Sequence, residues 1–141
     1  MEYPIQTEHL RATQIKITKG GYIKMFEGEC LCGSVKYDVN EPISIVECCH
    51  CLLCRKAHSS AFAMGVTIKR SSFKLIRGDE QLAEFESSPG KFRMFCKKCG
   101  SHLYAYRPSC ILDIRLRPAL LNTDLSKFKI EHINIENRFC I

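Results

Sequence analysis

The sequence has no run of about 18 or more apolar residues, so we expect no segment of it to span a membrane. Its first six residues, MEYPIQ, lack the basic start and the following apolar stretch of a secretory signal peptide. We therefore expect a cytoplasmic protein, in a compartment where glutathione and thioredoxin keep thiols reduced.

Linkers, internal repeats and low-complexity tracts are also missing. With 45% hydrophobic and 26% charged residues, the composition is that of a soluble globular domain rather than a disordered chain. A length of 141 residues suits one domain with a single modest core. We predict that this domain spans residues 25–141. Residues 1–24 form an extension without an assigned role, in which residues 13–17 alternate as a strand would.

Cysteine, in contrast, is abundant, with ten residues. Two pairs are each followed by a glycine, in Cys-x-Cys-Gly at residues 30–33 and in Cys-x-x-Cys-Gly at residues 96–100. Glycine permits the sharp backbone bend that points amide N–H groups at metal-bound sulfurs. If the intervening strands fold back, the four thiolates close a tetrahedron without an open position, as in a structural zinc site. The alternatives are two unrelated buried pairs, or a disulfide framework, which a reducing compartment disfavours.

A denser cluster lies between these pairs, with four cysteines and a histidine in residues 48–54. Cys49, Cys51 and Cys54 fit one short loop that runs into a helix, and all three can reach one ion. Three protein ligands and one exchangeable position are typical of catalytic zinc. Such an ion can hold a substrate thiol as a thiolate that attacks a small aldehyde.

The neighbours of these cysteines leave an alternative open. Side chains adjacent in an extended backbone point to opposite sides, so we expect Cys48 and His50 to point away from the ion. If one of them or another residue fills the fourth position, this second site is structural instead.

Hydrophobic alternation with a period of two predicts half-buried strands along most of the chain. Short helices are expected only at residues 52–58 and 122–128. The pattern predicts a mainly β, single-domain antiparallel fold. The alternating segments are 35–39, 62–68, 112–116 and 133–135, and the turn signals are Asn40-Glu41-Pro42, Arg77-Gly78-Asp79 and Ser87-Ser88-Pro89-Gly90.

Three segments together resemble the glutathione-dependent formaldehyde-activating enzyme family, which includes centromere protein V-like proteins. They are GECLCGSVKYDV (28–39), CHCLLCRKAHSSAF (49–62) and FESSPGKFRMFCKKCGSHL (85–103). The resemblance runs from about Gly28 to His132 and implies a β-tent fold organised by two zinc ions. It also implies a carbon–sulfur lyase activity, S-(hydroxymethyl)glutathione synthase, which joins glutathione to formaldehyde. The family's structural zinc ligands correspond to Cys30, Cys32, Cys96 and Cys99, and its catalytic zinc ligands to Cys49, Cys51 and Cys54.

Further residues near the clusters are candidates for substrate contacts. Arg55, Lys56 and Arg93 can pair with the carboxylates of a glutathione-like peptide. His58 and His102 can orient a sulfur ligand or shuttle a proton, although a surface position is the commoner case. We expect Cys110 and Cys140 to be small buried residues, and Phe92, Phe95, Tyr104 and Tyr106 to belong to the core.

Charge allows rival functions without selecting one. The formal net charge is +6, spread along the chain without a dense basic block. A four-thiolate zinc site contributes −2 and a three-thiolate site −1, which leaves the zinc-loaded chain near +3. This mild basicity suits small anionic ligands as well as nucleic acid and singles out neither, although we do not expect nucleic acid to be a partner. The rivals are a non-catalytic zinc module that binds protein or nucleic acid, and a thiol redox sensor.

Overall fold

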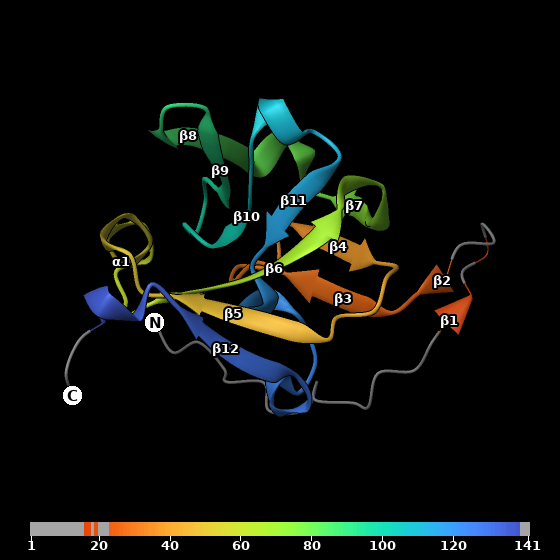
Figure 1. Cartoon of the computed structure of the whole chain (residues 1–141). Helices are drawn as coiled ribbons and strands as arrows, with labels where there is room; N and C mark the ends of the chain where they lie inside the picture. Colours follow the sequence, from red (N-terminus) through yellow and green to blue (C-terminus); the bar gives the residue numbers. More distant parts are fainter. Residues whose placement is uncertain (1–15, 18, 20–22, 139–141) are drawn as a thin grey trace, which may run out of the picture.

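The computed structural model describes residues 16, 17, 19 and 23–138. In this part the chain is mainly β and has one α-helix, α1 (Leu52–His58) (Figure 1). No helix among the described residues is long and apolar enough to cross a membrane. The strands are β1 (Lys16–Ile17), β2 (Ile23–Lys24), β3 (Phe26–Glu29), β4 (Lys36–Val39), β5 (Ile45–Cys49), β6 (Ala63–Lys69), β7 (Phe73–Arg77), β8 (Leu82–Ser88), β9 (Lys91–Cys96), β10 (His102–Tyr106), β11 (Asp113–Leu116) and β12 (Lys129–Ile133).

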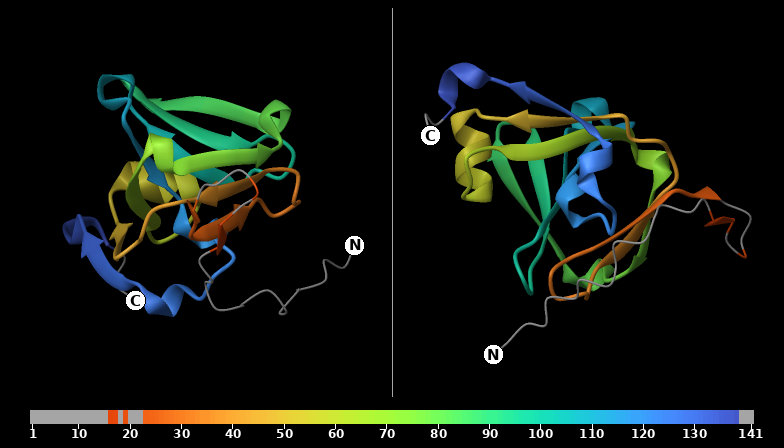
Figure 2. Two further views of the ribbon diagram at one scale, coloured as in Figure 1. Left: turned by 90° about the vertical axis from the view of Figure 1, so that its right-hand side faces the viewer. Right: turned by 90° about the horizontal axis from the view of Figure 1, so that it is seen from below.

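The strands form one large sheet, a smaller one and a short pair. The large sheet has seven strands in the order β12-β5-β6-β11-β10-β9-β8, and the smaller one has the order β3-β4-β7. Neighbours are antiparallel, as predicted, except that β12 runs parallel to β5. These two strands are far apart in sequence, so a long connection can bring them into parallel register. The pair β1-β2 stands apart from both sheets (Figures 1 and 2).

The hydrophobic core draws on both larger sheets. Tyr37 of β4 is fully buried and its ring stacks on that of Phe73, with centroids 4.9 Å apart. Gly28 of β3 lies so close to this ring that a Cβ atom there would be 2.2 Å from Cζ of Tyr37. A side chain at this position would therefore displace the ring. The buried residues of β4, β5, β6, β10 and β11 include Val39, Val46, Val66, Ile68, Leu103, Ile114 and Leu116.

Several predicted elements have the expected bounds, and others end early. The helix predicted over residues 52–58 is α1. The helix predicted over residues 122–128 is a single 3₁₀ turn, Leu125–Lys127, because Asp124 caps it by accepting a hydrogen bond from the Ser126 amide. Of the strand expected over residues 13–17, only Lys16–Ile17 lies among the described residues.

The last predicted strand also stops early. β12 ends at Ile133, because Asn134 adopts the left-handed conformation with φ 54° and starts a 3₁₀ turn that contains Ile135.

The strand predicted over residues 112–116 begins one residue late. Leu112 lies before the start of β11 and is exposed rather than half-buried. The mainly β, single-domain prediction is thus confirmed. The β-tent assignment, its organisation by zinc and the boundary at residue 25 stay predictions.

The fold brings three segments together around α1. β5 ends at Cys49, directly before the helix, and the end of β12 lies beside it (Figures 1 and 2). β9 and β10 approach the same region from the other edge of the large sheet.

Candidate metal centres and ligand cavity

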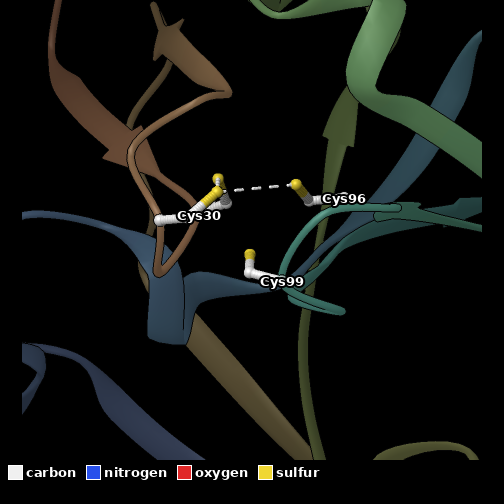
Figure 3. A group of neighbouring side chains, drawn as sticks. Cys30, Cys96 and Cys99 are labelled. Atoms are coloured by element: carbon white, nitrogen blue, oxygen red, sulfur yellow. Dashed lines mark hydrogen bonds between the residues drawn. The ribbon is translucent and has the colours of Figure 1, made fainter. Parts of the chain in front are cut away.

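Four cysteines from two distant turns meet at one point. Cys30 and Cys32 follow β3, while Cys96 ends β9 and Cys99 lies in the turn before β10. Their four sulfurs all lie within 4.8 Å of one another, with Cys30 to Cys32 at 3.5 Å and Cys32 to Cys96 at 3.9 Å. Figure 3 shows Cys30 facing Cys96 and Cys99 across this space. The arrangement can hold a metal ion.

Both turns depend on the glycines that follow the cysteine pairs in the sequence. Gly33 and Gly100 have φ values of 72° and 78°, in the left-handed region that favours glycine. In each turn the glycine amide donates to the carbonyl of the first cysteine, at 2.9 Å to Cys30 and 2.7 Å to Cys96. The Val35 amide donates to the sulfur of Cys30 at 3.3 Å. Each cysteine pair is thus followed by the sharp bend that was expected at its glycine.

The electrostatics of this cluster favour a cation. Burial raises the pKa of the Cys30 thiol to about 12, and the neighbouring cysteine sulfurs act in the same direction. Burial acts against ionisation of Cys99 too, but hydrogen bonds from the Ser101 hydroxyl and amide outweigh it and lower the pKa to about 6. Four sulfurs this close can all become thiolates only around a positive ion, because like charges at this distance oppose ionisation.

The second cluster is local in sequence. Cys49 is the last residue of β5, Cys51 is the N-cap of α1 and Cys54 lies in the first turn of the helix. The Cys54 amide donates to the sulfur of Cys51 at 3.4 Å, so the cysteine takes the place of the usual capping residue. The three sulfurs lie within 4.8 Å of one another and can also hold a metal ion. Among the described residues, no fourth cysteine, histidine or carboxylate joins them.

Cys48 and His50 point away from this cluster, as expected. Cys48 is 2% exposed, and burial raises the pKa of its thiol. His50 is buried against the ring of Phe62, and its Nε2 lies 2.8 Å from Nδ1 of His132. A metal ion held by Cys49, Cys51 and Cys54 would therefore have its fourth coordination position on the face opposite Cys48 and His50.

On that side the three cysteines line a cavity of about 500 Å³. Its wall is rich in cations, which outnumber the two carboxylates, Glu47 and Asp113. Glu47 already forms an ion pair with Arg115. The cavity can thus accommodate an anionic molecule of moderate size. The basic residues in its wall are Lys91, Arg107, Arg115 and Arg117.

Two of the arginines near the cysteines are buried. Arg93 is 2% exposed and Arg117 is 7% exposed. Nη2 of Arg93 lies 4.0 Å from the sulfur of Cys54, and Nη1 of Arg117 donates to the carbonyl of Met64 at 3.1 Å. None of the ion pairs in the described part of the chain includes either guanidinium. Because burying an unpaired cation is costly, the negative charge that offsets them must come from the site itself.

The basic groups near Cys54 lower one another's pKa values. Burial and the charge of Arg93 lower the pKa of Arg117 to about 10, and Cys54 opposes this shift. Burial and then Arg93 also lower the pKa of the Lys91 amine, again against the influence of Cys54. Positive charge is thus concentrated beside the sulfur of Cys54.

The other candidate residues lie in different places. Arg55 and Lys56 are on α1 and do not line the cysteine cavity, and their role in binding substrate stays a prediction. His58 and His102 are half-buried rather than on the surface, with ring centroids 4.6 Å apart. Nε2 of His58 lies 3.4 Å from Nη1 of Arg93, and burial followed by the charge of Arg117 lowers the pKa of His58 to about 3.

The expectation for Cys110 is wrong. This residue is exposed in the 3₁₀ turn Pro108–Cys110, because β11 begins only at Asp113, and it lines the cysteine cavity. Cys140 lies outside the described residues. Of the four expected core aromatics, Tyr104 is buried, while Phe92, Phe95 and Tyr106 are only partly buried.

The cationic wall was not anticipated from the sequence. A signal for part of it exists, because Arg115 alternates with the buried Ile114 and Leu116 and so belongs to the opposite face of its strand. No comparable signal points to Lys91 or Arg107.

Comparisons with known proteins point to one family. The family model of the glutathione-dependent formaldehyde-activating enzyme matches residues 25–131. An uncharacterised lyase of Schizosaccharomyces pombe is 36% identical over 120 residues, which cover 82% of this chain and 78% of the relative. A protein of Halomonas elongata, whose name assigns it provisionally to glutathione-dependent formaldehyde activation, is 26% identical over 123 residues, 81% of this chain and 77% of its own.

A crystal structure supports the fold independently. A Rhodobacter sphaeroides protein superposes with a TM-score of 0.61 at 23% identity, covering 74% of this chain and 98% of its own. At this level of identity the likeness concerns the fold alone. Together with the family match and the 36% identical relative, it leads to one conclusion. The chain belongs to the glutathione-dependent formaldehyde-activating enzyme family.

Proposed function

We propose that this protein is a carbon–sulfur lyase that joins a small thiol, glutathione, to formaldehyde or a related aldehyde, in the cytoplasm. The observation that carries the proposal is the convergence of three cysteine sulfurs, without a fourth ligand from the described cysteines, histidines and carboxylates, on a cavity with a cationic wall. The family match supports the same reaction.

Zinc fits both cysteine clusters. With a Zn–S distance of about 2.3 Å, two sulfurs of a zinc tetrahedron lie about 3.8 Å apart. The distances of 3.5 Å between Cys30 and Cys32 and 3.9 Å between Cys32 and Cys96 are close to this value. Soft thiolate ligands select zinc over harder divalent ions. We therefore assign one structural ion to the four-cysteine cluster and one catalytic ion to Cys49, Cys51 and Cys54.

The buried arginines favour a fourth thiolate at the second centre. Three thiolates and a divalent ion have a net charge of −1, and Arg93 and Arg117 add two positive charges. Counting only these two buried guanidiniums, the sum is then +1, and a substrate thiolate offsets it. Zinc bound in this way would keep the substrate sulfur ionised at neutral pH. A neutral ligand would leave the buried positive charge uncompensated.

The basic wall can orient the rest of the substrate. Glutathione has two carboxylates, and Arg107 and Arg117 line the same cavity as the cysteines. Charge-assisted hydrogen bonds from these groups would hold the peptide with its sulfur toward Cys54. An orientation of this kind places the thiolate and the aldehyde in one cavity, which raises their effective concentration.

Lys91 is the residue that we assign to proton delivery. When the thiolate forms the carbon–sulfur bond, the electron pair of the carbonyl bond moves to oxygen, which needs a proton. The Lys91 ammonium lines the cavity, and its pKa is lowered by burial and by Arg93, so it gives up a proton more readily than a surface lysine. Solvent returns the proton to the amine, and the reverse reaction uses the same groups.

Native mass spectrometry of the protein purified under reduction tests the proposal. The expected spectrum shows two zinc ions and, after addition of glutathione, one adduct. In the Cys54→Ser variant the adduct and any aldehyde turnover should be lost, while one zinc ion remains. The proposal is wrong if Cys54→Ser binds glutathione and turns over formaldehyde as the unaltered protein does.

A further inference from the structure

We propose that Asn134 is a positioning residue of the three-cysteine centre, and that it holds the sulfur of Cys49 in place as a thiolate. This inference rests on the proposed function, in which Cys49 is a metal ligand. It goes beyond that function because it adds a group from the end of the last strand of the sheet, and because Asn134 lies outside the family match over residues 25–131.

The contact is direct. Nδ2 of Asn134 donates to the sulfur of Cys49 at 3.1 Å, although the two residues are 85 positions apart in the sequence. Parallel pairing of β12 with β5 places Ile133 opposite Cys49, and the next amide along, that of His50, donates to the carbonyl of Ile133 at 3.1 Å. The backbone register thus fixes Asn134 directly beyond the sulfur.

The backbone of Asn134 also suits this role. It has φ 54° and ψ 43°, the left-handed conformation that asparagine tolerates better than most residues other than glycine. This conformation ends β12 and turns the chain into the 3₁₀ turn Ile135–Asn137, which the carbonyl of Asn134 begins by accepting from the Asn137 amide at 3.2 Å. The side chain is therefore held where the strand stops, at the wall of the cysteine cavity.

The hydrogen bond has two expected effects. An N–H donor stabilises the negative charge on a metal-bound sulfur, and it fixes the orientation of the cysteine side chain. Of the three sulfurs, Cys51 receives the Cys54 amide and Cys54 lies near Arg93. Asn134 completes the set, since it gives Cys49 a donor that the local loop does not supply. Each of the three sulfurs then has a neighbouring N–H group that orients it, and the fourth coordination position of the ion faces the cavity.

Two substitutions distinguish the contribution of the Asn134 side chain from that of its backbone conformation. Asn134→Gly keeps the left-handed conformation and removes the amide, while Asn134→Asp keeps the shape and replaces the donor with a carboxylate. Asn137→Ala is the control, because Asn137 lies in the same turn and its side chain donates to Glu136 at 3.1 Å. The probe is Co²⁺, whose thiolate charge-transfer absorption reports the ligand set, and the four-cysteine site is an internal reference in every variant.

We expect Asn134→Gly to weaken metal binding at the three-cysteine centre about tenfold, the lower end of the range for loss of a supporting hydrogen bond. Asn134→Asp should weaken it further, since a carboxylate beside a thiolate repels it, and both variants should shift the charge-transfer absorption of this centre alone. Asn137→Ala should match the unaltered chain. If the unaltered chain binds two ions and both Asn134 variants retain its affinity and spectrum, the inference is wrong while the proposed function stands. If the unaltered chain binds one ion only, both are wrong.

Discussion

The guanidinium of Arg93 on β9 lies 4.0 Å from the sulfur of Cys54 on α1, across 39 positions of sequence. Its other nitrogen faces the ring of His58, four residues further along the same helix. One buried cation is thus placed between the cysteine centre and a neutral histidine. This position makes Arg93 a source of positive potential for any anion that reaches the cavity.

Replacing Arg93 with methionine should therefore weaken glutathione binding to the zinc-loaded protein by about tenfold or more. The basis is electrostatic, since Arg93 lies behind Cys54 and does not line the cavity. Unit charges about 8–10 Å apart attract each other by roughly 2 kcal/mol at an effective dielectric constant of about 20. Methionine retains much of the buried volume, so the zinc content should stay at two. Isothermal titration calorimetry measures the change, with exposed Lys127→Met as the control for loss of one positive charge. Equal affinities of Arg93→Met and the unaltered protein would contradict this role.

The four-cysteine cluster should determine whether the chain folds. Cys96→Ser removes a fully buried ligand, and the binding free energy of a structural zinc is of the same order as the whole stability of a small domain. We expect this variant to lose the cooperative thermal transition seen by circular dichroism. Cys110→Ser, an exposed residue outside both clusters, should change stability by no more than about 0.5 kcal/mol. A cooperative transition in Cys96→Ser with two zinc ions bound would contradict the assignment.

Stability should fall as the pH drops below 6.5, in part because of His58. The pKa of its ring is about 3 in the folded chain, against the ordinary value of 6.5 that we take for the unfolded chain, so the unfolded state binds more protons between these values. The stability is complete above pH 6.5 and is lost as the pH falls toward 3. His58→Gln should match the unaltered protein at pH 7.5 and become relatively more stable at pH 5.5.

The gain of His58→Gln at pH 5.5 should be at most about 1 kcal/mol, because the ring is only half-buried and solvent screens its charge. Urea unfolding at the two pH values, in excess zinc, measures it. A difference between the two proteins that is the same at both pH values would show that His58 is not the titrating group.

Gly65 leaves space for two arginines of the cavity wall, because it has no side chain. A Cβ atom at this position of β6 would lie 2.5 Å from Nε of Arg115 and 3.1 Å from Nη1 of Arg117. Gly65→Ala should therefore displace both arginines and lower glutathione affinity several-fold, with two zinc ions still bound. Gly90→Ala is the matched control, since its Cβ would meet nothing within 4 Å but its φ of 71° is unfavourable for alanine. It should cost about 1–2 kcal/mol of stability and leave affinity unchanged.

The two cysteine clusters were accessible from sequence because their geometry is mostly local. Cys49, Cys51 and Cys54 need only one turn and the start of a helix to converge, and the spacing alone indicates this. The glycines after the other two pairs reveal the bend of each knuckle. Only the meeting of those two turns depends on the tertiary fold.

Most of the cations and Asn134 were not accessible, because sheet order decides their positions. Arg117 reaches the centre from the end of β11 and looks in the sequence like any other basic residue of this chain. Arg93 was a candidate because it lies close to the third cysteine pair in sequence, but its position beside Cys54 depends on the place of β9 in the sheet. Arg55 and Lys56 were chosen because they follow Cys54 directly, yet the helical turn takes them outside the lining of the cysteine cavity.

The parallel pairing of β12 with β5 also sets an order of events during synthesis. At about 5–20 residues per second, the ribosome adds Asn134 roughly 4–17 s after Cys49, which it contacts across 85 positions. For those seconds the emerging three-cysteine loop has all its sulfurs but not its distant donor. If the loop holds a metal ion as proposed, the ion can therefore reach it before the last strand has been added to the sheet.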